Sequence, residues 1–162
     1  ESLIKAAEDQ ARSIIESSIA NAKIRMNWMI LSEKEKIIDR VFDEVKKKLR
    51  EFTSTNEYDK ILESLIEEGA IAAGGGELQV HINSYDHRRN PALDQLSSNV
   101  EKATGVRTML RKAAEPASII GGTLIKSEDG KVTVDNTLEA LIESRRKDLE
   151  PKISTILFTK TD

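Results

Sequence analysis

Residues 1–52 have the sequence ESLIKAAEDQARSIIESSIANAKIRMNWMILSEKEKIIDRVFDEVKKKLREF, which contains neither glycine nor proline. The first glycine of the chain is Gly69 and the first proline is Pro91. The stretch carries 11 lysine and arginine residues and 10 aspartate and glutamate residues, a mixture of signs that a solvated helix tolerates well. The sequence therefore predicts one uninterrupted helix over residues 1–52.

Apolar residues recur along this helix at an interval of eleven. Two such series are present, namely Ile4, Ile15, Met26 and Ile37, and Ile19, Ile30, Val41 and Phe52. Eleven residues in three turns give 3.67 residues per turn, a period that favours a right-handed supercoil. Toward the end of the stretch, Leu31, Ile38, Val45 and Phe52 also fit a heptad. We expect a partner helix to pack on an apolar stripe formed by Ile4, Ala11, Ile15, Ile19, Ala22, Met26, Ile30, Ile37 and Val41.

The length of the helix supports this expectation. A helix of 52 residues is ~78 Å long, whereas the remaining 110 residues would form a globule with a radius of gyration of ~13 Å. Each isoleucine left in water would forgo about 1.5–3 kcal/mol of burial, so the stripe predicts a second helix, from another chain or from self-association as a dimer. The alternative is a break near Asn27 or Ser32 that folds the helix back as a hairpin, although neither residue is a strong breaker.

Composition excludes several other classes of protein. Aromatic residues make up 4% of the chain and charged residues 33%, a balance typical of long solvated helices rather than of a compact enzyme. The net charge of −3 gives no general attraction to nucleic acid or to anionic lipid. Without cysteine, disulfides and thiolate metal sites are excluded. The chain begins with Glu1 rather than methionine, as expected of a fragment or a processed form.

The second part of the chain predicts a small α+β domain over residues 53–162, after the stalk helix at 1–52. Ser54 and Glu57 have the spacing of a capping box, which predicts a new helix running to Gly69 or slightly beyond. The alternation of Leu78, Val80 and Ile82 predicts a half-buried strand. Asn90 and Pro91 then predict the start of a helix that stops at Gly105. A strand over residues 106–110 would complete a parallel crossover.

The last third of the chain predicts a hairpin and a final helix. Strands are expected over residues 119–125 and 131–134, joined by a short turn that ends at Gly130. The final helix should begin at Asn136, whose side chain can cap it while Glu139 reaches back. Pro151 should kink or break this helix near Glu150. The fold class is therefore α+β, with a long helix followed by a mixed sheet of about four strands packed by helices.

No motif in the sequence predicts catalysis, a cofactor or a metal. Gly74–Gly76 is followed by a strand rather than by Gly-Lys-Ser/Thr and a helix, so it is interpreted as a flexible connector. His81 and His87 lack the ligand number and spacing of a metal site. The short basic clusters, Arg88-Arg89 and Arg145-Arg146-Lys147, suggest ion pairing at a protein interface or a solvated face.

A set of motifs stands near the end of the chain. Paired glycines precede a strand, a turn ends in glycine, Asp-Asn-Thr-Leu-Glu follows, and Leu-Phe stands near the terminus. These residues are Gly121, Gly122, Gly130, Asp135, Asn136, Thr137, Leu138, Glu139, Leu157 and Phe158. As a set they resemble the E subunit of the archaeal A-type and vacuolar V-type ATPases. One position departs from the family pattern, because Leu141 stands where members often carry arginine.

The resemblance implies a non-catalytic peripheral-stalk, or stator, subunit of a proton- or ion-translocating rotary ATP synthase. It implies that the long helix pairs with the H subunit, called G in eukaryotes, in a right-handed coiled coil. It also implies that the C-terminal domain binds the catalytic head of A and B subunits, near the top of the B subunit. The membrane stator subunit would be contacted indirectly, on the cytoplasmic face of the membrane. Three alternatives remain open: an adaptor of a flagellar or type III export ATPase, a small nucleic-acid-binding module, and an enzyme built around the glycine run at residues 74–76.

Overall fold

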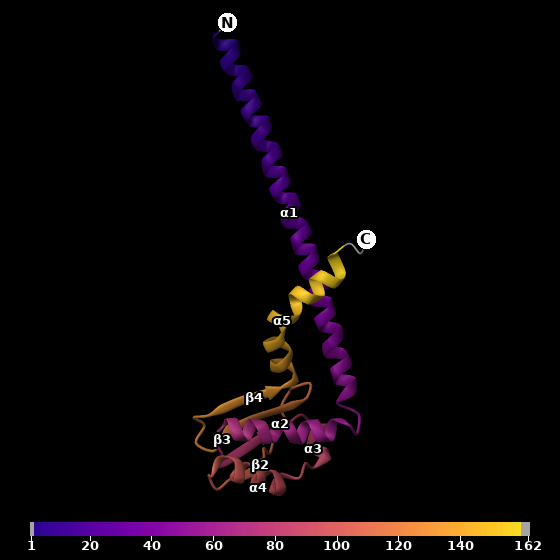
Figure 1. Cartoon of the computed structure of the whole chain (residues 1–162), viewed down its shortest axis with the longest axis vertical. Helices are drawn as coiled ribbons and strands as arrows, with labels where there is room; N and C mark the ends of the chain where they lie inside the picture. Colours follow the sequence, from indigo (N-terminus) through magenta and orange to yellow (C-terminus); the bar gives the residue numbers. More distant parts are fainter. Residues whose placement is uncertain (1, 160–162) are drawn as a thin grey trace. The chain divides into compact units, whose positions relative to one another are not determined.

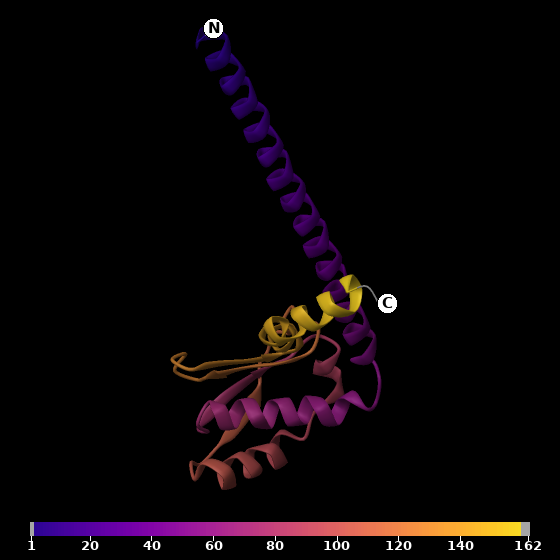
Figure 2. The ribbon, with the colours of Figure 1, turned by 45° about the horizontal axis from the view of Figure 1, so that its top comes forward.

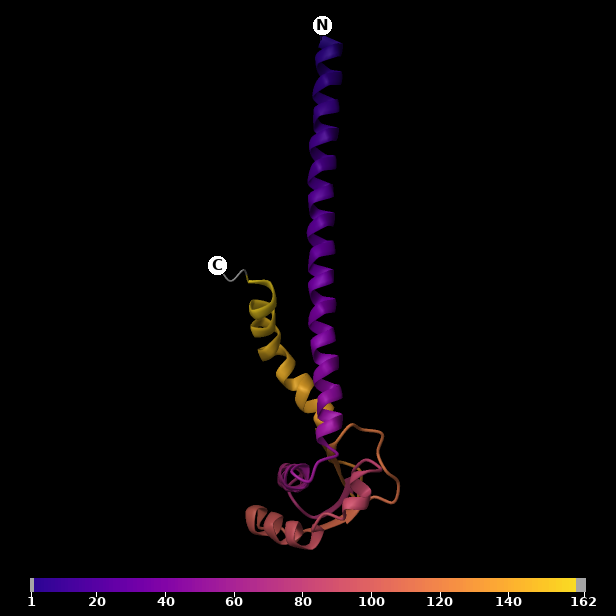
Figure 3. The same cartoon turned by 90° about the vertical axis from the view of Figure 1, so that its right-hand side faces the viewer.

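The long N-terminal helix is present in the computed structural model, which describes residues 2–159 of the chain. Helix α1 runs from Ser2 to Phe52 without interruption, so the prediction of one continuous helix is confirmed and a break near Asn27 or Ser32 is excluded. Figure 3 shows its unbroken ribbon. The contacts of the chain divide it into two compact units. One contains the described residues up to Phe42 and from Ile153 onward, and the other runs from Asp43 to Lys152.

The second unit contains a four-stranded mixed sheet with the strand order β2-β1-β3-β4. Its strands are β1 (Glu77–His81), β2 (Met109–Lys112), β3 (Gly122–Ser127) and β4 (Thr133–Thr137). Strand β1 pairs with β2 in parallel and with β3 antiparallel, and β3 pairs antiparallel with β4. The predicted crossover, hairpin and α+β fold class are confirmed. Strand β2 begins three residues later than predicted, at Met109 instead of Val106.

Two helices of this unit pack against the sheet, α2 (Tyr58–Ala72) and α4 (Leu93–Thr104). The unit also contains α3 (Asp86–Arg89) and the first part of α5 (Leu138–Phe158). Helix α2 contacts β3 and β4, while α4 contacts β2 and α2, and Figures 1 and 2 show α2 and α4 side by side. Alternate residues of the strands join those of the helices in the hydrophobic core, which comprises Tyr58, Leu62, Leu65, Ile66, Ala70, Leu78, Val80, Ile82, Leu96, Val100, Leu110, Ile125 and Leu138.

The predicted capping box after α1 is wrong. Glu57 itself occupies the N-cap position of α2 and makes no side-chain capping bond. The hydroxyl groups of this segment instead bond back to the first helix: Thr53 donates to the Arg50 carbonyl and Thr55 to the Phe52 carbonyl, each at 2.8 Å. Residues 53–55 therefore satisfy carbonyl groups at the end of α1, where the last carbonyls of a helix lack partners within it.

The predicted helix starts at Asn90 and Asn136 are also wrong. Asn90 ends α3 with φ of 54°, a left-handed conformation that asparagine adopts more readily than most residues, and α4 begins only at Leu93. Asn136 lies in β4, where its side-chain amide donates to the Leu65 carbonyl at 3.0 Å. The hydroxyl of Thr137 takes the capping role and accepts from the Ala140 N–H at 3.2 Å.

Two further features concern the long helices. Helix α5 continues through Pro151 to Phe158, so of the two predicted outcomes the break does not occur, and the kink stays a prediction. Within the described range, no helix combines the length and the apolar character that a membrane span requires.

Candidate partner-binding stripe and turn clamp

Most of the predicted apolar stripe is exposed on α1. Ile4 and Ile15 are 66% and 59% exposed, and Met26 is 54% exposed. Ile19, Ile30, Ile37, Ala11 and Ala22 are exposed as well, while Val41 is half-buried. The structure therefore places eight of the nine predicted contact residues on a surface open to a partner. Their contacts with a partner stay a prediction.

Large apolar side chains outside the predicted stripe are also exposed on α1. Trp28 is 67% exposed and Met29 is 70% exposed. Only Ile38 and Phe42 are buried among the described residues of this helix. Since burial of one such side chain is worth about 1.5–3 kcal/mol, α1 has a large amount of free energy to gain from association.

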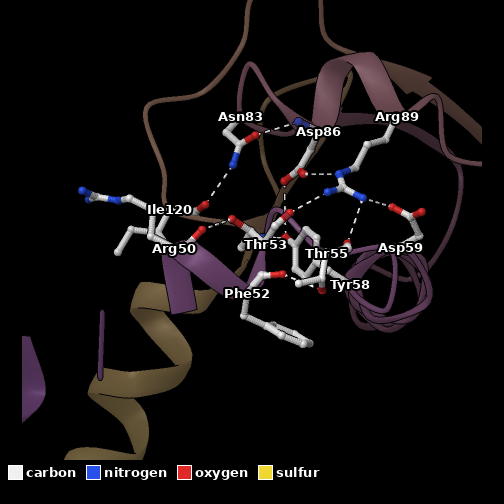
Figure 4. Close-up of polar contacts among 11 residues, drawn as sticks. Arg50, Phe52, Thr53, Thr55, Tyr58, Asp59, Asn83, Asp86, Arg89 and Ile120 are labelled. Atoms are coloured by element: carbon white, nitrogen blue, oxygen red, sulfur yellow. Dashed lines mark hydrogen bonds and ion pairs between the residues drawn. The ribbon is translucent and has the colours of Figure 1, made fainter. Parts of the chain in front are cut away.

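A second cluster lies where α1 ends and the chain turns into α2. Arg89, from α3, donates to the Thr53 carbonyl at 2.6 Å and to the Thr55 carbonyl at 3.2 Å. Its guanidinium group also pairs with Asp59 and lies 5.6 Å from the ring centroid of Tyr58. Figure 4 shows the side chain reaching from α3 to the turn. We call Arg89, Asp86, Asp59 and Tyr58 the turn clamp.

Asp86 and Tyr58 form the buried side of the turn clamp. Both residues are 0% exposed, and the Tyr58 hydroxyl donates to Asp86 Oδ2 at 3.3 Å. The same hydroxyl accepts from the Gly122 N–H at 2.5 Å, which connects the clamp to β3. Burial raises the pKa of Asp86 to about 6, against the opposing effects of the Tyr58 hydrogen bond and the Arg89 charge. Burial also raises the pKa of Tyr58, so its hydroxyl keeps its proton.

The paired glycines of the sequence make room for the turn clamp. A Cβ on Gly121 would lie 2.7 Å from the Tyr58 hydroxyl and 2.7 Å from Thr53 Cγ2. Gly122 has φ of 79°, and a Cβ there would overlap the Asn136 carbonyl oxygen. The chain can approach Tyr58 and β4 this closely only without side chains at these two positions.

The structure also shows the contacts of the two histidines and of the two basic clusters. His87 Nε2 lies 2.9 Å from the Ala113 carbonyl oxygen, and burial lowers the pKa of His81. No group of three or more potential metal ligands occurs between residues 2 and 159. The Arg89 side chain bonds to the Thr53 and Thr55 carbonyl groups and to Asp59 within the turn clamp. Its interpretation as an interface or solvated residue is therefore wrong. In the second basic cluster, Arg145-Arg146-Lys147, Arg146 Nε lies 3.6 Å from Glu150 Oε2.

Comparison with known proteins identifies the family. The family model described as "ATP synthase (E/31 kDa) subunit" matches residues 1–158. The chain belongs to this family. Relatives named as the E subunit of an A-type ATP synthase occur in Methanothermobacter thermautotrophicus, with 34% identity over 130 residues, and in Methanococcus maripaludis, with 31% identity over 160 residues. These alignments cover 79% and 98% of this chain, and 63% and 78% of the respective relatives. The chain thus spans under two thirds of the first relative.

The family-motif residues of the second unit mostly hold its fold together. The Leu138 N–H donates to the Gly121 carbonyl at 3.0 Å, and the Ile120 N–H donates to Glu139 at 2.6 Å. The Thr137 hydroxyl donates to Asp135 at 2.6 Å. Gly130 allows the hairpin turn, with φ of 69°. At the other end of the motif, Leu157 is exposed and the Phe158 ring lies 5.0 Å from the Lys34 ammonium group.

Proposed function

We propose that this chain acts as the peripheral-stalk E subunit of an A-type ATP synthase, without catalytic activity of its own. In this role α1 pairs with the second stalk protein, the H subunit, in a right-handed coiled coil. The second unit binds the catalytic head of A and B subunits, near the top of the B subunit. The stalk meets the membrane stator subunit at its other end, so the chain is held peripherally at the cytoplasmic face of the membrane.

The exposed apolar stripe on α1 is the observation that carries this proposal. Its eleven-residue period matches the geometry of a right-handed coiled coil. Six isoleucine and methionine residues of the stripe are at least 39% exposed, an arrangement that a partner helix would stabilise. Membership of the ATP synthase E family supports a place in the ATP synthase assembly.

The alternatives have less support. A nucleic-acid-binding module would use the basic pair at Arg88 and Arg89, but the Arg89 side chain is only 20% exposed and is paired with two carboxylates. The relatives are named as ATP synthase subunits rather than as export adaptors, which favours the stalk over the export-ATPase role.

Binding to the H subunit tests the proposal. The chain and the H subunit encoded in the same genome should form a 1:1 complex in sedimentation velocity, and Trp28 fluorescence should change on mixing. Ile15→Asp should weaken the complex at least ~10-fold, because loss of about 1.5–3 kcal/mol of burial corresponds to roughly ten- to a hundred-fold in affinity.

Ser13→Asp provides a matched control, because it introduces the same charged residue at an exposed position of α1 outside the stripe. This variant should bind like the unaltered chain. Absence of a complex together with an unchanged Trp28 spectrum would contradict the pairing of α1 with the H subunit. Equal weakening by both variants would show that the stripe is not the binding surface.

A further inference from the structure

The turn clamp contains two carboxylates and one cation, and one of the two carboxylates, Asp86, is fully buried. Asp86 and Asp59 share a single guanidinium group, that of Arg89. The Asp59 side chain is 51% exposed and is therefore solvated, whereas the Asp86 side chain is 0% exposed. One oxygen of Asp86, Oδ1, makes no hydrogen bond, and its ion pair with Arg89 Nε is long, at 3.4 Å. A buried carboxylate with such incomplete compensation is costly in its ionised form.

The elements around Asp86 supply few other charges. Helix α2 contributes Tyr58 and Asp59, and α3 contributes Arg89. The turn after α1 contributes the carbonyl groups of Thr53 and Thr55, which accept hydrogen bonds from Arg89. The Asn83 side-chain oxygen accepts from the backbone N–H of Asp86 and does not contact the carboxylate. Arg89 is therefore the cation that acts on Asp86, and Asp59 competes for it.

We infer that the turn clamp is a proton-linked latch, which holds the turn after α1 more firmly when Asp86 is protonated and releases it more readily when Asp86 is ionised. Opening the turn exposes Asp86 to water, where the ionised form is solvated. When Asp86 is protonated, opening the turn no longer gains this solvation energy. Arg89 then pairs with Asp59 and donates to the two carbonyl groups of the turn without competition from Asp86. This property concerns the chain alone and does not depend on which subunits it binds.

The sign and size of the effect follow from linkage. Burial raises the pKa of Asp86 from 3.8 to about 6 in the closed clamp, and an opened clamp returns it toward 3.8. The closed state therefore binds a proton more tightly, so lowering the pH favours closing and raising it through about 6 favours opening. A difference of two pKa units corresponds to roughly a hundred-fold change in the opening equilibrium.

Hydrogen exchange at the turn measures this equilibrium directly. The amides of Thr53, Ser54 and Thr55 donate to carbonyl groups of α1 at 2.9, 3.1 and 2.9 Å, so their exchange reports opening of the turn. Exchange is measured by NMR from pH 4.5 to 8 and divided by the intrinsic rate at each pH. The protection factors of these amides should fall at least ten-fold as the pH rises through about 6. Amides of β1 and β3 serve as the internal reference for the core.

Two variants separate the latch from a general effect of pH. Asp86→Asn keeps an oxygen that can accept from Tyr58 but cannot ionise, so the protection of the turn should become independent of pH. Asp94→Asn, at an exposed position in the first turn of α4, should keep the original profile. A profile that persists in Asp86→Asn, or turn protection that falls on acidification of the unaltered chain, would overturn the inference.

A direct titration keeps the inference testable if Asp86→Asn does not fold. The carboxyl carbon of Asp86 is followed by NMR in the unaltered chain. A midpoint near 6 supports the latch, and a midpoint at or below 3.8 refutes it.

Discussion

Gly122→Ala should destabilise the second unit more than a glycine-to-alanine change whose only cost is the positive φ of the residue. The residue has φ of 79°, which costs a non-glycine residue about 1–2 kcal/mol. Its added methyl group would also overlap the Asn136 carbonyl oxygen and approach Thr137 Cα at 3.0 Å, contacts made by backbone rather than by a flexible side chain. Overpacking of this kind costs about 1–3 kcal/mol. We expect a loss of about 2–5 kcal/mol in the free energy of unfolding.

Gly130→Ala provides the matched control for this prediction. Gly130 has φ of 69°, but a Cβ there would have nothing within 4 Å, so only the conformational cost applies. Urea unfolding of each variant, followed by circular dichroism, should give a lower midpoint for Gly122→Ala than for Gly130→Ala, by about 0.5–1.5 M for a typical m-value. Equal midpoints would refute the argument that close backbone packing, rather than the sign of φ alone, requires glycine at residue 122.

Three further substitutions test the contacts around the turn and the hairpin. Tyr58→Phe removes the hydroxyl that joins Asp86 to Gly122 and should lower the free energy of unfolding by about 1–3 kcal/mol in urea melts, whereas Tyr85→Phe, at a residue 71% exposed, should change it by less than ~0.5 kcal/mol. Arg89→Lys cannot reproduce the planar set of donors that spans two carbonyl groups and two carboxylates, so hydrogen exchange at residues 53–55 should accelerate; unchanged exchange would contradict this role. The Ser127 hydrogen bond holds the pKa of Asp129 down to about 2, so its ionised form favours folding above pH 3.8 and this contribution fades as the pH falls through about 2; Ser127→Ala should raise that pKa in a carboxyl NMR titration, and an unchanged value would show that the hydroxyl is not its main cause.

The elements that sequence could predict are those with a strong local period. The absence of glycine and proline predicted α1 correctly, and the alternation of Leu78, Val80 and Ile82 predicted β1, which ends one residue before Ile82. Gly105 ends α4 with φ of 71°, as its position in the sequence indicated. In each case the signal and the structure that it determines lie within a few residues of each other.

The predictions that failed concern side chains with distant partners. Asparagine is a residue type that often caps helices, but the side-chain amide of Asn136 donates to the Leu65 carbonyl, 71 residues away. Arg89 was expected to lie at an interface or on a solvated surface, but its partners Thr53 and Asp59 are 36 and 30 residues away in the sequence. A single sequence does not show whether such a side chain will bond to its neighbours in the chain or to a carbonyl group far away in the sequence. The one available signal was the spacing of Asp86 and Arg89, which places opposite charges one helical turn apart.

The two candidate sites also differ in whether a local sequence pattern or distant contacts determine them. The apolar stripe is visible in the sequence because an exposed hydrophobic face must repeat with the period of its helix, whatever binds to it. The turn clamp is not visible, because it assembles only when α2, α3 and β3 meet at the end of α1. Under the proposed stalk role, a load carried along α1 would pass through this turn to α2. There, the packing of Phe52 on Tyr58, with ring centroids 6.1 Å apart, and the hydrogen bonds of Arg89 resist displacement. Tyr58 and Arg89 come from different helices, α2 and α3, so no local sequence pattern predicts that they meet at this turn.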